Sequence, residues 1–291
     1  MRTSVRLSAY ALGLIVLFGA AVSAGRLAGT DKPATQTPHA TAEGHAGHEA
    51  TTTQLPGGLQ ITQGGYALSP VTTALRPGRR QVLAFRILGP DGKPVTQYTA
   101  EHGAELHLIV VRRDLAGYQH PHPTRAADGT WSATFTAGPP GQYRMFADFT
   151  PRARGDNFVL GADIPAAGDY QPRELPGPTW ETVVDGYTVT RAGDPQAGTE
   201  SWMTVSVSKA GQPVTLEPYL GAYGHLVALR QGDLAYLHMH PQEGTAAGPD
   251  VTFDARVPAA GVYRLFLEFQ HGGRVHLAEF TASTTSAHTH N

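Results

Sequence analysis

Six histidines recur in one pattern at two places in the chain. Stretches 103–123 and 221–241 align without a gap at an offset of 118 residues, and each carries a lone histidine followed by His-x-His-Pro. The six are His107, His120 and His122 in the first stretch, and His225, His238 and His240 in the second. Imidazole nitrogens are common ligands of zinc and copper. The pattern therefore predicts a three-histidine metal site in each copy.

The spacing within each stretch predicts a β-hairpin that gathers the three rings on one face. Residues two apart on a strand share a face. In the second stretch a turn at Gly232-Asp233 places His225 opposite His240, with His238 diagonal to it. We expect this to be the face that packs in the core of the domain.

In the first stretch the turn lies within 112–115, and two registers remain open. One pairs His107 with His120, and the other pairs His107 with His122. Both keep the rings on one face. Further side chains lie where they could add a ligand. They are His102 in the first copy only, His271 and His276 in the second copy only, and Asp148 and Glu268 at matching positions in the two copies.

The chain contains no cysteine. A disulfide framework, a thiolate metal site and a cysteine nucleophile are therefore excluded. Among the ions that three imidazoles suit, the Irving–Williams order favours Cu(II), with Zn(II) as the alternative. We expect either one ion in each copy or one ion shared at the interface between the copies.

Two other interpretations compete with copper binding or homeostasis. Duplication also preserves neutral residues, so the histidines can be packing residues of a structural or protein-interaction module. A third interpretation is an enzyme with an open three-histidine zinc site. Only Glu268 or Asp148 offers a general base for it, and we expect the protein not to be an enzyme. The net charge of -2, without a basic stripe, argues against nucleic acid as a partner.

The elements that must position these histidines belong to a duplicated domain. The stretch 141–149 matches 261–269, and short runs of β-branched and aromatic residues are separated by turns rich in Gly, Pro and Asp. We expect an all-β protein with two tandem immunoglobulin-like or cupredoxin-like β-sandwiches at residues 57–168 and 176–283.

The segments outside the repeats predict an extracytoplasmic protein. Residues 1–24 combine Arg2 and Arg6 with an apolar run, which is typical of a cleaved signal peptide, or of a membrane anchor if residues 7–25 are retained. Residues 25–56 are expected to form a flexible tether and residues 284–291 a flexible tail. Both carry histidines that could capture metal weakly. These are His39, His45, His48, His288 and His290.

The succession of an apolar strand, His-x-His-Pro and a Gly-x-Tyr-Arg strand resembles uncharacterised secreted or membrane-anchored bacterial proteins. More loosely, residues 57–282 are similar to the YtkA-like and CopC-like extracytoplasmic β-sandwich domains. The resemblance implies copper binding through the six histidines of the repeated pattern. We expect a metal ion, and another extracytoplasmic metal-handling protein, as partners. The resemblance implies no catalytic residue.

Overall fold

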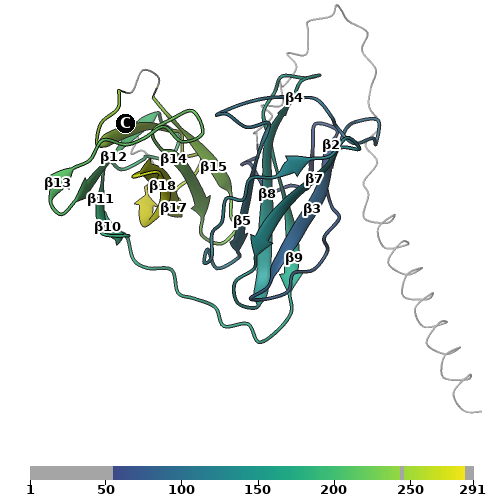
Figure 1. Ribbon diagram of the computed structural model, residues 1–291, viewed down its shortest axis with the longest axis horizontal. Helices are drawn as coiled ribbons and strands as arrows, with labels where there is room; N and C mark the ends of the chain where they lie inside the picture. Colours follow the sequence, from purple (N-terminus) through teal and green to yellow (C-terminus); the bar gives the residue numbers. More distant parts are fainter. Residues whose placement is uncertain (1–54, 243–245, 286–291) are drawn as a thin grey trace, which may run out of the picture. The chain divides into compact units, whose positions relative to one another are not determined.

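Strands joined by turns make up the part of the chain that the computed structural model describes, residues 55–242 and 246–285 (Figure 1). These residues belong to one compact unit, Thr53–Asn291. The expected signal segment, the tether up to residue 54 with its three histidines, and His288 and His290 lie outside the described residues. Within the described residues, no helix has the length and apolarity needed to cross a membrane.

Nine strands of each repeat lie within the described residues. Repeat 1 contains β1 Thr62–Gln63, β2 Tyr66–Pro70, β3 Arg80–Leu88, β4 Tyr98–Thr99, β5 Leu106–Arg112, β6 Thr124–Arg125, β7 Thr130–Thr136, β8 Gly141–Pro151 and β9 Phe158–Ala166. Repeat 2 contains β10 Glu181–Val184, β11 Tyr187–Ala192, β12 Ser201–Lys209, β13 Gln212–Pro213, β14 His225–Arg230, β15 Tyr236–Pro241, β16 Asp250–Ala255, β17 Gly261–His271 and β18 Arg274–Thr284.

Repeat 1 is a two-sheet sandwich. One sheet has the order β1-β2-β3-β7-β6, and the other has the order β4-β8-β5 with β9 paired to β8. Period-two alternation places Leu83, Phe85 and Ile87 of β3 in the core between the sheets, where each is 0% exposed. The expected all-β fold with two tandem sandwiches is therefore confirmed.

Repeat 2 has its own core, but its strands form one continuous path, β10-β11-β12-β16-β15-β14-β17-β18, with β13 paired to β12. The path is continuous because β15 changes partner along its length. Its first part pairs with β14, from Tyr236 to Met239, and His240 and Pro241 pair with β16. The equivalent stretch of repeat 1 forms only a bridge between Gln119 and Val110.

The observed hairpin registers agree with those predicted from the turn positions. In repeat 2 the pairs Leu226↔Met239 and Val227↔His238 follow the register that the Gly232-Asp233 turn predicts. In repeat 1 the bridge Val110↔Gln119 selects, of the two open registers, the one that pairs His107 with His122.

The face that carries the histidines does not pack inside either sandwich, which corrects our expectation. On β5, Leu108 and Val110 point into the core of repeat 1, whereas Ile109 and Val111 join a third apolar cluster. This third cluster contains side chains of both repeats, so it is a core between the two sandwiches. Strands β5 and β14 are consequently buried on both faces, a pattern that the sequence shows only as an unbroken apolar run.

Equivalent residues of the two repeats meet in reciprocal pairs in this inter-repeat core. Tyr118 of repeat 1 stacks on Phe266 of repeat 2, with ring centroids 4.1 Å apart and planes at 10°. Tyr236, the equivalent of Tyr118, lies against Phe146, the equivalent of Phe266, at 5.3 Å. The repeats are thus related by an approximate two-fold axis, as in an isologous dimer interface.

Candidate metal centre

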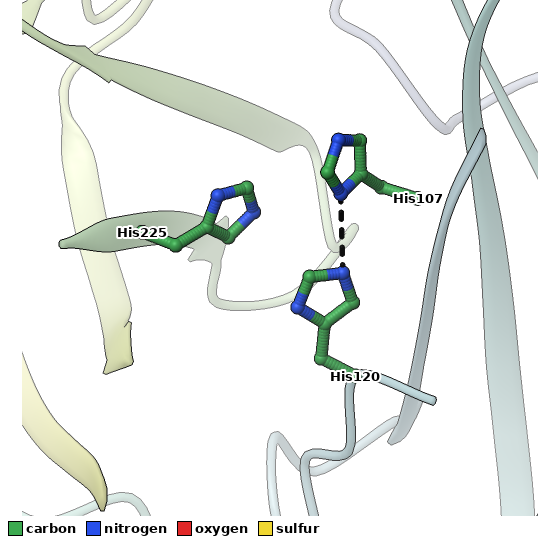
Figure 2. A group of neighbouring side chains, drawn as sticks. All are labelled: His107, His120 and His225. Atoms are coloured by element: carbon green, nitrogen blue, oxygen red, sulfur yellow. Dashed lines mark hydrogen bonds between the residues drawn. The ribbon is translucent and has the colours of Figure 1, made fainter. Parts of the chain in front are cut away.

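Three buried histidines converge beside the inter-repeat core. His107 and His120 come from repeat 1 and His225 comes from repeat 2, and their exposed fractions are 4%, 9% and 4%. Figure 2 shows the three rings facing a common space. One nitrogen from each ring lies within 4.8 Å of the other two. Within the described residues, no other group of three or more histidines and acidic side chains converges in this way.

The contacts of two of these rings determine where their protons are. His107 Nε2 is 3.1 Å from the carbonyl oxygen of Glu101, which can only accept, so this nitrogen donates. His120 Nδ1 is 2.6 Å from a carboxylate oxygen of Glu268, so this nitrogen donates as well. In a neutral imidazole the second nitrogen then carries a lone pair. Those second nitrogens, His107 Nδ1 and His120 Nε2, face each other at 3.3 Å.

Two nitrogens in that position can share a cation, either a proton or a metal ion. A nitrogen–nitrogen distance of about 3.3 Å is also the edge of a tetrahedron whose ligand bonds are about 2.0 Å long. Three atoms within 4.8 Å of one another share a point no more than about 2.8 Å from each, which is 4.8 Å divided by √3. Small ring rotations would therefore bring all three nitrogens to bonding distance of one ion.

The outer contacts of the triad match those of known metal-binding histidines. Such histidines donate their second N–H to a carboxylate or a backbone carbonyl, which fixes the tautomer and the ring orientation. His120 has the carboxylate of Glu268, and His107 has the carbonyl of Glu101. The ring of His225 stacks on both, with centroids 5.0 Å from His107 and 4.9 Å from His120.

Three more histidines extend from the triad to the surface. His102 Nε2 lies 2.9 Å from Nδ1 of the exposed His240, and the His102 ring centroid is 6.4 Å from that of His107. On the other side, the exposed His122 lies 5.1 Å from His120 and hydrogen-bonds with the hydroxyl of Tyr219 at 2.8 Å. Desolvation of the ring, aided by the adjacent His120, lowers the pKa of His122, which favours the neutral form that binds metals.

The acidic residues nearest the triad have other partners as well. Asp148 accepts hydrogen bonds from Asn157 Nδ2 at 2.8 Å and from the hydroxyl of Tyr236 at 3.3 Å. Burial, followed by the negative charge of Asp148, raises the pKa of Tyr236 well above its usual value. Burial, followed by the charge of Glu268, does the same for Tyr118. Both phenols therefore remain neutral.

The structure places His271 and His276 in a different network. His271 Nδ1 is 2.8 Å from the hydroxyl of Tyr187, and His276 Nδ1 is 2.7 Å from a carboxylate oxygen of Asp185. The reason is strand alternation, because His276 packs against Phe269 on the sandwich-core side of the sheet. Glu268, the neighbour of Phe269, points to the inter-repeat side. The structure therefore does not bring His271 and His276, which we expected to be able to add a ligand, to the triad.

The residues of the repeated pattern combine across the repeats rather than within each repeat. His107 and His120 meet His225, while His122 and His240 lie further out. The backbone of His238 pairs with Val227, and its side chain lies outside the described part of the structure. Of the two arrangements expected from the sequence, the triad corresponds to the site shared between the copies.

Two contributors were not found from the sequence. One is the Glu101 carbonyl, which has no side-chain signature. The other is Tyr219, which occupies the position equivalent to Glu101 in the repeat alignment. Tyr219 and Glu101 are each the sixth residue before a lone histidine, and this shared position is the signal by which Tyr219 could be found.

Comparison with protein families gives a match over both repeats. The family DUF8832, described as a domain of unknown function, matches residues 61–160 and again residues 181–286. These ranges together cover well over half of the chain. The matching family is not that of the YtkA-like or CopC-like domains. No curated protein matches the chain.

Several solved structures are similar at low identity. One is FdeC, an adhesin of Escherichia coli, at 16% identity and a TM-score of 0.25, covering 77% of this chain and 65% of that one. Another is InvD of Yersinia pseudotuberculosis, at 14% identity and a TM-score of 0.26, covering 78% and 59%. A three-Ig segment of titin is similar at 11% identity and a TM-score of 0.21, covering 76% of this chain and 64% of that one. The chain thus spans less than two thirds of each, and we draw no function from these likenesses.

Proposed function

Because the chain belongs to DUF8832, a family of domains of unknown function, we propose a function from the site itself: the protein binds a divalent transition-metal ion between its two sandwiches. The ligands are His107, His120 and His225. The observation that carries the proposal is the pair of lone-pair nitrogens of His107 and His120, which face each other at 3.3 Å inside a buried site.

The donor set suggests which ion is bound. Three neutral imidazoles without any thiolate suit Cu(II) and Zn(II), and at equal availability the Irving–Williams order favours Cu(II). His238 is proposed as a fourth ligand, since it is the repeat equivalent of His120. A site assembled from two equivalent pairs would then hold the ion symmetrically about the approximate two-fold axis.

The proposed setting is extracytoplasmic. The apolar segment within residues 1–24, preceded by Arg2 and Arg6, is the basis for this part of the proposal. In that setting the protein would act in copper binding or homeostasis rather than in catalysis. It would exchange its ion with another extracytoplasmic metal-handling protein.

Metal analysis of the purified protein tests the proposal. The protein carries no polyhistidine tag, and alanine replaces His39, His45, His48, His288 and His290, so that terminal histidines do not contribute. We expect one Cu(II) per chain, and loss of that ion in His120→Ala and in His225→Ala. His271→Ala serves as the matched control and keeps the ion. Unchanged stoichiometry in both triad variants would contradict the proposal.

A structural or protein-interaction module is the second candidate. The contacts of the triad favour this candidate if the cation between His107 and His120 is a proton. A proton shared by His107 and His120 would make a cation next to Glu268, and the 2.6 Å contact would then be an ion pair between the repeats. This candidate expects no bound ion, and a melting temperature that neither chelator nor Cu(II) changes. The metal-site proposal expects Cu(II) to raise the melting temperature and chelator to reverse the increase.

A further inference from the structure

The two exposed ends of the histidine cluster are built from equivalent loops that carry different side chains. Loop 101–104 and loop 219–222 each close with a bridge between their first and fourth residues. The second residue of each has a left-handed backbone, with φ of 47° at His102 and 51° at Leu220. The backbone geometry is thus shared by the two repeats, whereas only loop 101–104 has a histidine at this second position.

The end that carries His102 presents two nitrogen ligands together. His102 Nε2 and His240 Nδ1 are 2.9 Å apart. Adjacent ligands on one ion are separated by about 2.8 Å at a right angle and about 3.3 Å at a tetrahedral angle, for bonds of about 2.0 Å. An ion that replaces the proton between these two nitrogens would therefore gain two ligands with little movement.

Among the described side chains, the other end offers one nitrogen, that of His122. His122 Nε2 hydrogen-bonds with the Tyr219 hydroxyl at 2.8 Å. Burial, followed by the negative charge of Glu268, raises the pKa of that phenol, so it stays protonated and is a poor ligand. The position equivalent to His102 is occupied here by Leu220, which has no ligand atom.

His102 also lies between the surface and the triad. His240 is exposed and His102 is half-buried, and the His102 ring centroid is 6.4 Å from His107 and 6.3 Å from His225. A chain of imidazoles therefore leads from solvent to the buried ligands at this end.

We propose that His102 and His240 form an outer ligand pair, which takes the metal ion from solvent and passes it by ligand exchange to the buried triad. This inference rests on the proposed function, and it adds the route by which the ion enters and leaves. As the ion binds the outer pair, the proton between the two nitrogens leaves to solvent. Transfer to the triad then exchanges nitrogen ligands without any change in oxidation state.

Rapid mixing of the protein with Cu(II), in the background that lacks the terminal histidines, tests the route. The variant is His102→Leu, which copies the residue of the equivalent loop. We expect the rate constants of uptake and of chelator-driven release both to fall at least ten-fold, with one ion per chain and an unchanged dissociation constant. His240→Ala should show the same slowing. His122→Ala, at the other end, should stay within two-fold of the parent.

The outcomes separate this inference from the proposed function. If the parent binds no ion, both are overturned. If the parent binds one ion and His102→Leu leaves both rates unchanged, only the outer pair is overturned. A weaker dissociation constant with an unchanged uptake rate also overturns it, because His102 would then be an equilibrium ligand rather than a point of entry. Slowing by His122→Ala alone would place the route at the opposite end.

Discussion

Glu268 is the residue on which the geometry of the triad most depends at the scale of single side chains. Its carboxylate accepts a hydrogen bond from His120 Nδ1 at 2.6 Å, and this contact orients the unprotonated Nε2 of His120 toward His107. Glu268 is itself buried, 8% exposed, on the strand that pairs directly with β14. It therefore links the ring of one repeat to the backbone of the other.

Replacing Glu268 by Gln should weaken metal binding without removing a ligand. The amide can present its NH₂ group to His120 Nδ1, which reverses the tautomer and turns a protonated Nε2 toward the ion. Loss of such an outer partner costs about 10–100-fold in metal affinity. The measurement is a competitive Cu(II) titration. The control is Glu279→Gln, which loses only its ion pair with Arg264 on the adjoining strand. An affinity within two-fold of the parent would show that Glu268 does not orient the ring.

The sequence predicted the participating residue types at this scale but not their partners. All three triad histidines, and Glu268, stood out by their repeat positions. Their assignment to separate sites in each copy was not supported, because a strand pattern does not reveal which surface covers its outer face. His276 illustrates the same limit. Because neighbouring residues on a strand face opposite sides, a shift of one residue decides whether its side chain lies on the inter-repeat face or in the sandwich core, where it packs against Phe269.

The two histidine-bearing hairpins depend on apolar surface rather than on the histidines at the scale of elements. Ile109 and Val111 on β5, and Val227 and Leu229 on β14, are each 0% exposed in the inter-repeat core. These residues share faces with His107 and His225, and they hold the hairpins together whether or not an ion is bound. Turn residues predicted the register of the second hairpin and left two registers open for the first, but they could not predict that both faces of these strands are buried.

Phe266→Ala should test how much the inter-repeat core stabilises the fold. Phe266 is 0% exposed and stacks on Tyr118 of the other repeat at 4.1 Å. Truncation of a buried Phe costs about 3–5 kcal/mol. We expect a loss of that size in the free energy of unfolding from urea denaturation, with metal binding weakened in parallel. Phe280→Ala, in the core of repeat 2, is the matched control: it should destabilise that repeat without acting directly on the interface. A loss below about 1 kcal/mol for Phe266→Ala would mean that the interface can repack around the gap.

The two repeats act as one folded body at the scale of the whole molecule. Their contact has an apolar part, formed by the reciprocal tyrosine–phenylalanine pairs, and a polar part, formed by histidines and carboxylates. The linker between β9 and β10 runs exposed for most of its length, and Leu175 packs against the inter-repeat core. The repeats are thus held together by their shared core as well as by the chain.

Cutting the linker should therefore leave the repeats associated. A protease site inserted after Gly177, which is exposed and has open space around it, allows cleavage of the folded protein. We expect the two fragments to elute together from a sizing column in native buffer and to separate in denaturant. The same cleavage of the Phe266→Ala variant serves as the comparison. We expect its two fragments to separate in part on the sizing column. Fragments of the native sequence that separate without denaturant would show that the linker, not the core, holds the repeats together.

The approximate two-fold axis within a single chain has a consequence for dilute conditions. A site whose ligands come from two separate subunits disassembles when the protein concentration falls below the dissociation constant of the dimer. Here a linker of fewer than twenty residues supplies an effective concentration on the order of millimolar, whatever the bulk concentration. The affinity of the triad for its ion should therefore not depend on how much protein is present, so a single molecule carries a complete site.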